Sequence, residues 1–136
     1  MRALVVHCHP SPESYTAAVR DTVLARLGAG GAEAELIDLY AEGFDPVLTR
    51  AGWERYEETP ANRSDVAAHA AALHRADALL FVYPTWWYGP PAVLKGWMER
   101  VLLPDVAFSN PADGPIRPGL TQIRDLAVFT TCGASR

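Results

Sequence analysis

Residues 3–27 have the sequence ALVVHCHPSPESYTAAVRDTVLARL. Positions 3–8 form a nearly continuous apolar run, which is typical of a strand buried on both faces. In the part that follows, Tyr15, Val19, Val23 and Leu27 recur every four residues and therefore share one face of a helix. A buried strand, a polar turn and a helix in this order predict the start of a βαβ unit.

Three further segments have the composition of buried strands. They are rich in apolar residues and are bounded by polar or glycine-containing turns: 32–40, 76–84 and 125–133. Between them, residues 64–76 and 91–102 predict helices. Strands that alternate with helices predict a doubly wound, parallel α/β sheet.

The ends of the predicted helices carry residues typical of caps. Glycines from Gly28 onward are expected to end the first helix, and Ser64 and Asp65 to begin the second. Pro90 and Pro91 suit the first turn of the third.

The remaining segments show no clear periodicity. Residues 41–63 predict a long connection with a short helical piece over 53–58, and residues 104–119 predict an irregular stretch. Four other side chains, which could suggest cofactor contacts, are expected to serve packing or the surface: His69, His74, Trp97 and Met98.

The composition is that of one ordinary globular domain, because 49% of the 136 residues are hydrophobic and 21% are charged. The net charge is -4 and Lys95 is the only lysine, so the basic stripe that binds nucleic acid is missing. The sequence predicts no membrane span and no secretion signal, and hence a cytoplasmic protein. Cys8 and Cys132 are expected to be free thiols.

Three loops follow predicted strands, with the sequences HPSPESYT (9–16), PTWWYGPP (84–91) and TTCG (130–133). In a doubly wound sheet, ligands bind beyond the carboxyl ends of the strands, at the point where the strand order reverses. We therefore expect these loops to meet at one ligand site.

The first loop permits several interpretations. The free N–H groups of a helix start, hydroxyls such as Ser14 and Thr16, and His9 together suit a phosphate ester. Alternatively, Ser14 is simply an N-cap residue. A metal site at His7 and His9 lacks further ligands, and a nucleophilic Cys8 would point away from both histidines.

The second loop contains three consecutive large aromatic residues, Trp86, Trp87 and Tyr88. So many rings in one turn favour a ligand or subunit contact, although they could also cap the core. In the third loop, small side chains allow the backbone of residues 130–133 to approach a ring edge. Neither a GxGxxG nor a P-loop motif occurs.

Four blocks of the sequence resemble the flavodoxin-like NAD(P)H:quinone oxidoreductases of the DT-diaphorase type. These blocks are HPSPESYTAAV (9–19), DLYAEGFDPVLT (38–49), RADALLFVYPTWWYGPPAVLKGWMERVL (75–102) and VFTTCG (128–133). The resemblance implies bound FAD, or alternatively FMN, with NAD(P)H as co-substrate and a quinone or similar acceptor. It also implies a two-electron ping-pong hydride transfer in a homodimer whose active site lies at the subunit interface. No essential acid or base is assigned.

The resemblance also implies roles for individual residues. For the phosphate end, the ring and the ring edge of the flavin it suggests His9, Ser14, Tyr15, Thr16, Pro84, Thr85, Trp86, Trp87, Tyr88, Thr130, Thr131, Cys132 and Gly133. The family commonly has Phe and Asn at the positions of Tyr15 and Thr16, and Gly at that of Cys132. Phe108 matches an aromatic residue over the substrate side of the ring, and no metal ligand is implied.

The sequence departs from the family after Arg136, where relatives continue with a further helix, a fifth strand and a last helix. We therefore expect residues 1–136 to be a single flavin-binding domain that is incomplete at its C-terminal end, with the fourth strand as an uncovered edge. A fragment of a longer protein is the favoured explanation; a partner that covers the edge and a degraded relative of the family are the alternatives. For the function, the alternative to the enzyme is a non-catalytic flavin-binding regulatory subunit of a potassium efflux system.

Overall fold

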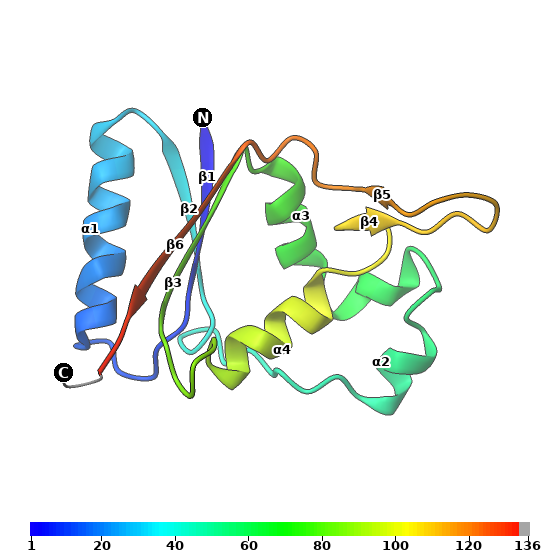
Figure 1. Ribbon diagram of the computed structural model, residues 1–136, viewed down its shortest axis with the longest axis horizontal. Helices are drawn as coiled ribbons and strands as arrows, with labels where there is room; N and C mark the ends of the chain where they lie inside the picture. The colour runs from blue at the N-terminus through cyan, green and yellow to red at the C-terminus, as the bar shows by residue number, and fades with distance from the viewer. Residues whose placement is uncertain (134–136) are drawn as a thin grey trace.

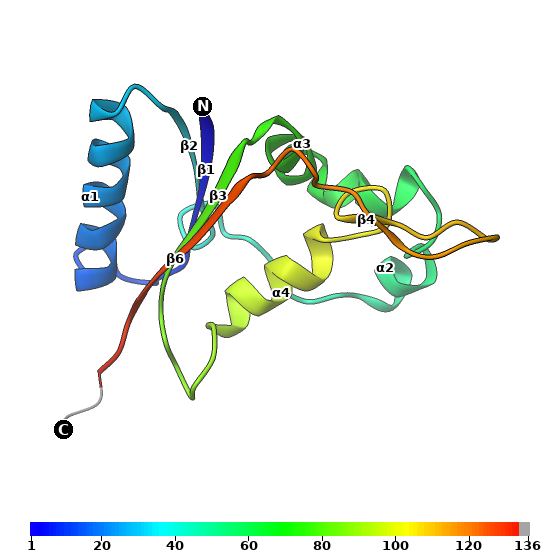
Figure 2. The same ribbon diagram turned by 45° about the horizontal axis from the view of Figure 1, so that its top comes forward.

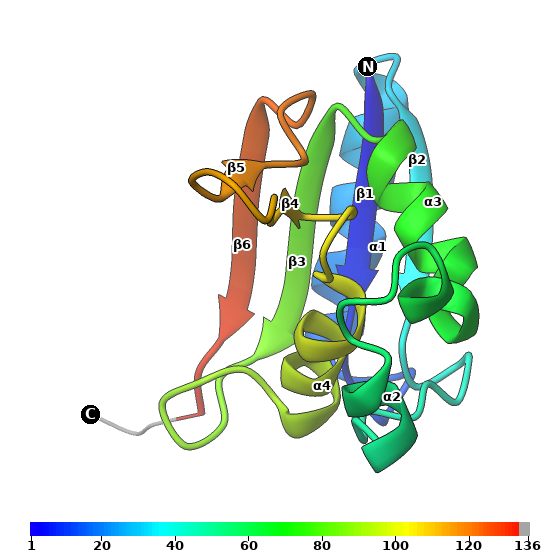
Figure 3. The same cartoon turned by 90° about the vertical axis from the view of Figure 1, so that its right-hand side faces the viewer.

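The computed structural model describes residues 1–133, so the last three residues of the predicted domain lie outside it. Four parallel strands form one sheet in the order β2-β1-β3-β6, as Figure 3 shows. Their bounds are Arg2–His7 (β1), Glu33–Asp38 (β2), Ala78–Pro84 (β3) and Asp125–Thr131 (β6). The predicted parallel α/β sheet is confirmed.

Burial follows the position of each strand in the sheet. The central strands β1 and β3 are almost entirely buried, which explains their continuous apolar runs. The edge strands β2 and β6 are mostly exposed. Among residues 1–133, β6 pairs only with β3, and Leu126 and Val128 are 69% and 51% exposed.

Helices cover the two faces of the sheet unequally (Figure 1). α1 (Tyr15–Ala29) lies alone on one face, while α3 (Ala67–Arg75) and α4 (Ala92–Val101) cover the other. α1 continues past Gly28 and ends at a cap on Gly30, so the predicted end is two residues early. The left-handed turn that follows is taken by Gly31, with φ of +76°.

The long connection contains two short helical segments, α2 (Arg50–Glu54) and the 3₁₀ helix η1 (Ala61–Val66). α2 begins earlier than the predicted piece at 53–58, because the Thr49 side chain caps it by accepting the N–H of Gly52. The predicted N-cap role of Ser64 and Asp65 is wrong. Both lie inside η1, which runs directly into α3 without a side-chain cap.

α4 begins one residue after the predicted start, with Pro91 as its N-cap. The stretch predicted as irregular forms a small hairpin, β4 (Phe108–Ser109) and β5 (Arg117–Pro118), which projects from the α3 and α4 side in Figure 2. No helix in residues 1–133 has both the length and the apolar content needed to cross a bilayer.

The larger core lies between the sheet and the α3 and α4 layer. Trp97 is fully buried there, with its ring edge-on to Phe81. Its indole N–H donates to His69 Nδ1 at 3.2 Å, and His69 Nε2 lies 2.9 Å from a carboxylate oxygen of Glu42. The expected packing roles of Trp97 and His69 are confirmed.

Candidate functional site

The three predicted loops meet at the carboxyl end of the sheet, the lower end in Figure 3. They enclose an open hollow of about 1270 Å³. Its lining contains all of the predicted cofactor-binding residues except Thr130: His9, Ser14, Tyr15, Thr16, Pro84, Thr85, Trp86, Trp87, Tyr88, Thr131, Cys132 and Gly133. The hollow exists because parallel strands bring their following loops to one edge.

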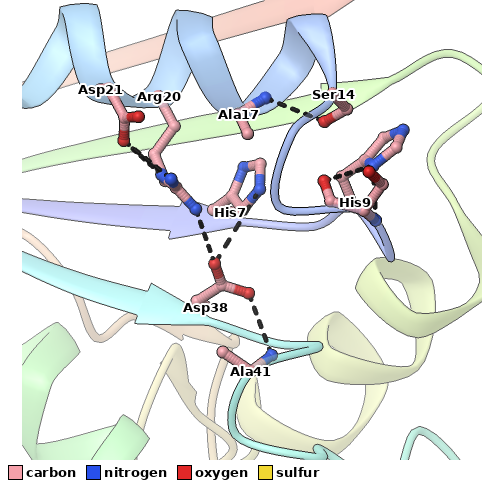
Figure 4. Close-up of polar contacts among 9 residues, drawn as sticks. His7, His9, Ser14, Ala17, Arg20, Asp21, Asp38 and Ala41 are labelled. Carbon is pink, nitrogen blue, oxygen red and sulfur yellow. Dashed lines mark hydrogen bonds and ion pairs between the residues drawn. The ribbon is translucent and has the colours of Figure 1, made fainter.

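The N-terminus of α1 opens into this hollow. Ser14 Oγ accepts the N–H of Ala17 at 3.1 Å (Figure 4). The Ser14 carbonyl accepts the N–H of Ala18. The N–H groups of Tyr15 and Thr16 take part in neither bond and remain available to an anion. Ser14 is thus an N-cap residue whose own hydroxyl hydrogen is still free to donate.

His9 lies beside the helix start. Its Nδ1 is 3.0 Å from the Ser11 nitrogen and 3.1 Å from the Ser11 carbonyl oxygen, and in the tautomer that accepts the Ser11 N–H a neutral ring carries its hydrogen on Nε2. The ring centroid is 6.0 Å from that of Trp86. His9 can therefore supply a further donor, Nε2–H, to an anion held at the helix start.

The aromatic residues of the second loop occupy a tight two-residue turn. The N–H of Trp86 donates to the Gly89 carbonyl at 3.0 Å, and the Gly89 N–H donates back at 3.1 Å. Trp87 and Tyr88 have φ of +48° and +62°, the left-handed pair of a type I′ turn. Their side chains are 97% and 99% exposed, so they do not cap the core.

Threonine hydroxyls join the three loops. Thr85 and Thr130 hydroxyl oxygens lie 2.5 Å apart, and the Thr85 N–H donates to the Thr131 carbonyl at 2.8 Å. Thr16 Oγ1 and Thr131 Oγ1 lie 2.9 Å apart. Because side chains alternate along β6, Thr130 is directed to Thr85 and not into the hollow, whereas Thr131 lines it.

A buried polar cluster lies under α1 and was not predicted from the sequence (Figure 4). His7 Nε2 is 3.9 Å from Asp38 Oδ2. The same carboxylate oxygen accepts a hydrogen bond from Arg20 Nη1 at 3.0 Å. Arg20 also bonds Asp21. Burial lowers the pKa of His7, although the Asp38 carboxylate opposes this, and His7 Nδ1 has no partner among the described residues. The sequence signal was a single histidine inside an apolar run.

The two cysteines are free thiols, as predicted, and lie in different surroundings. Cys8 is buried in the core on the α3 and α4 side, and burial raises its pKa to about 11, so it is not a reactive nucleophile. Cys132 is exposed and lines the hollow. Phe108 lies on the β4 hairpin, half-buried and outside the lining of this chain's hollow.

Comparison with known proteins places this geometry in a family. The family Flavodoxin_2, described as having a flavodoxin-like fold, matches residues 1–136, and the chain belongs to it. Its named relatives include quinone oxidoreductases, which confirms the resemblance seen in the sequence.

Two curated proteins of Rattus norvegicus illustrate the similarity. Ribosyldihydronicotinamide dehydrogenase (quinone) is 31% identical over 126 residues, which cover 81% of this chain and 54% of that protein. NAD(P)H dehydrogenase (quinone) 1 is 33% identical over 124 residues, which cover 79% of this chain and 45% of that protein. The chain thus spans about half the length of these relatives.

Two solved structures share the fold over almost the whole of this chain. The NAD(P)H:quinone oxidoreductase of Methanothermobacter marburgensis matches with a TM-score of 0.87 and 29% identity, covering 100% of this chain and 68% of that one. Smu.1420 from Streptococcus mutans matches 96% of this chain and 67% of that one, with a TM-score of 0.79 and 30% identity.

Proposed function

We propose that this chain is the flavin-binding domain of a flavin-dependent NAD(P)H:quinone oxidoreductase. The observation that carries the proposal is the hollow at the carboxyl end of the sheet, whose lining combines the anion donors at the start of α1 with the aromatic residues of the second loop. The names of the relatives support the same activity. The activity, acceptor and partners of the whole protein belong to this proposal.

The residues present fit a flavin phosphate. The N–H groups of Tyr15 and Thr16, the Ser14 hydroxyl and the His9 ring are hydrogen-bond donors at the start of α1. Among the residues that the structure describes, the lining contains no carboxylate that would repel an anion. These donors would hold the phosphate end of FAD, with FMN as the alternative.

The part of the hollow lined by the aromatic second loop fits the flat ring system of a flavin. Trp86, Trp87 and Tyr88 would pack against the isoalloxazine, with Pro84 and Thr85 beside them, while the loop containing Cys132 would contact its edge. A bound flavin supplies the acceptance of a hydride from NAD(P)H and its later transfer to a quinone. The chain's own residues bind and orient the cofactor, and the proposal assigns no residue as an acid or base.

The proposed assembly is a cytoplasmic homodimer. Phe108 lies on the projecting β4 hairpin and not at its own chain's hollow, so its proposed substrate contact requires the hollow of a second copy (Figure 2). Analytical ultracentrifugation of the protein with flavin checks this point. A strictly monomeric species would contradict the assigned role of Phe108.

The central test is flavin binding and turnover. We expect the purified chain to bind FAD or FMN, to release it unchanged on denaturation, and to catalyse NAD(P)H oxidation by a simple quinone. Chromatography of the released flavin decides between the two cofactors. A chain that neither holds nor takes up flavin would refute the proposal, and tight flavin binding without turnover would refute the enzymatic part.

A pair of tryptophan variants tests the location of the site. Trp87→Ala removes a 97% exposed ring from the hollow, and Trp53→Ala removes a 67% exposed ring from α2, outside it. We expect Trp87→Ala to weaken flavin binding about tenfold, the order of one lost stacking contact, and Trp53→Ala to leave the affinity unchanged. Equal effects would place the flavin elsewhere.

A further inference from the structure

The side chain of Thr16 is a buried polar group in the first turn of α1. It is 2% exposed, and a hydroxyl buried to that degree needs a hydrogen-bond partner. Its partner is Thr131 Oγ1 at 2.9 Å, at the far end of the edge strand β6. In Figures 1 and 3 the start of α1 and the end of β6 lie at the same end of the molecule.

Thr131 is held from two directions. Its carbonyl accepts the N–H of Thr85, which ties its backbone to the aromatic loop, and its side chain reaches Thr16. Cys132 and Gly133, which follow it, line the hollow. One residue therefore connects the loop at the ring end with the helix start at the anion end.

The hydroxyl pair contains two hydrogens, and the mutual bond uses one of them. If Thr131 donates to Thr16, the hydrogen of Thr16 is available to an acceptor at the helix start. If Thr16 donates, the hydrogen of Thr131 is available at the ring edge. A phosphate is a stronger acceptor than a ring carbonyl, because hydrogen bonds to charged groups are the stronger ones. A bound phosphate thus favours donation from Thr131 to Thr16.

We infer that Thr131 is a positioning residue for the flavin phosphate and acts through the Thr16 hydroxyl. This inference rests on the proposed function. It extends the role that the sequence resemblance gave Thr131, which was contact with the ring edge alone. The predicted consequence is that the loss of the Thr131 hydroxyl weakens the binding of phosphorylated flavins and leaves the binding of unphosphorylated flavins nearly unchanged.

The test compares the affinities of FMN and riboflavin, which differ only in the phosphate, for the full chain. We expect Thr131→Val to weaken FMN binding about 5- to 10-fold, the order of one charge-assisted hydrogen bond, and to leave riboflavin binding within about twofold. Thr131→Ser retains the hydroxyl and should restore FMN binding. The matched control is Thr22→Val, on the same helix but outside the hollow, whose hydroxyl donates to the Ala18 carbonyl at 2.8 Å.

A double-mutant cycle tests the route through Thr16. If the two hydroxyls act as one unit, Thr16→Val combined with Thr131→Val binds FMN within about twofold of Thr16→Val alone. Effects that multiply would overturn the inference. If Thr131→Val does not unfold cooperatively in urea, Thr131→Ala compared with Thr131→Ser applies the same criterion.

The outcomes separate this inference from the proposed function. Equal loss of FMN and riboflavin affinity in Thr131→Val, or no loss of either, overturns the inference and leaves the flavin site in place. A wild-type chain that binds none of FAD, FMN and riboflavin overturns both.

Discussion

The two faces of the sheet are packed in different ways. Under α3 and α4 lies an extended apolar core with large rings, including Phe81 and Trp97. Under α1 the buried cluster consists of small aliphatic side chains such as Val5 and Val82, beside the polar group of His7, Arg20 and Asp38. The face whose helix begins at the hollow is thus the one with less apolar packing. The difference indicates that the α3 and α4 layer supplies most of the stability and that the α1 layer serves the site.

The largest expected effect comes from the Trp97 side chain. Trp97→Ala removes a fully buried ring and should lower the free energy of unfolding by roughly 3–5 kcal/mol. Val82→Ala, fully buried on the α1 face, should cost about 2 kcal/mol. Urea denaturation of both variants measures the contrast. Equal losses would show that the two layers contribute alike.

Two helical glycines sharpen the comparison. A Cβ on Gly96 of α4 would overlap the carbonyl oxygen, Cα and Cβ of Pro46, so Gly96→Ala should destabilise the protein by about 1–3 kcal/mol. A Cβ on Gly28 of α1 meets nothing within 4 Å. Gly28→Ala should therefore stabilise the protein by about 0.5–1 kcal/mol through helix propensity. Thermal melting of the two variants measures whether each substitution lowers or raises the stability. A Gly96→Ala variant with unchanged stability would contradict the close contact of α4 with Pro46.

The last expected effect concerns pH. Because burial lowers the pKa of His7, the unfolded chain takes up a proton before the folded one as the pH falls below about 6.5. Stability should decline from pH 7 to pH 5, with a slope of at most about 1.4 kcal/mol per pH unit from this residue. This range lies above the titration of Asp21, whose pKa the Arg20 hydrogen bond lowers.

Urea titrations at several pH values measure this slope. His7→Gln should flatten it, whereas His74→Gln, on an exposed part of α3, should retain it. An unchanged slope in His7→Gln would assign the acid sensitivity to another group.

The sequence predicted the parts of the molecule that depend on local pattern. The apolar runs of β1 and β3 identified the sheet because both strands are buried on their two faces. The convergence of His9, Trp86 and Thr131 followed from one topological rule, that loops after parallel strands share an edge.

Other features depend on partners distant in the chain and were missed. Nothing next to His7 in the sequence indicates Arg20 or Asp38, which arrive from a helix and a neighbouring strand. Ser64 has the chemistry of an N-cap, but η1 replaces the cap it would have made. Likewise, the pairing of Thr130 with Thr85 depends on the register of β6 against β3.

The turn at Trp87 and Tyr88 has a consequence for protein engineering. Left-handed backbone disfavours residues with a Cβ by roughly 1–2 kcal/mol each, and Asn-Gly is the preferred pair at these two positions. Selection for heat resistance would therefore favour exchanging both aromatic residues for small ones, since their side chains gain almost no burial in return. Variants improved for thermal tolerance alone should lose the aromatic wall of the hollow early, and a stabilisation campaign should hold these two positions fixed.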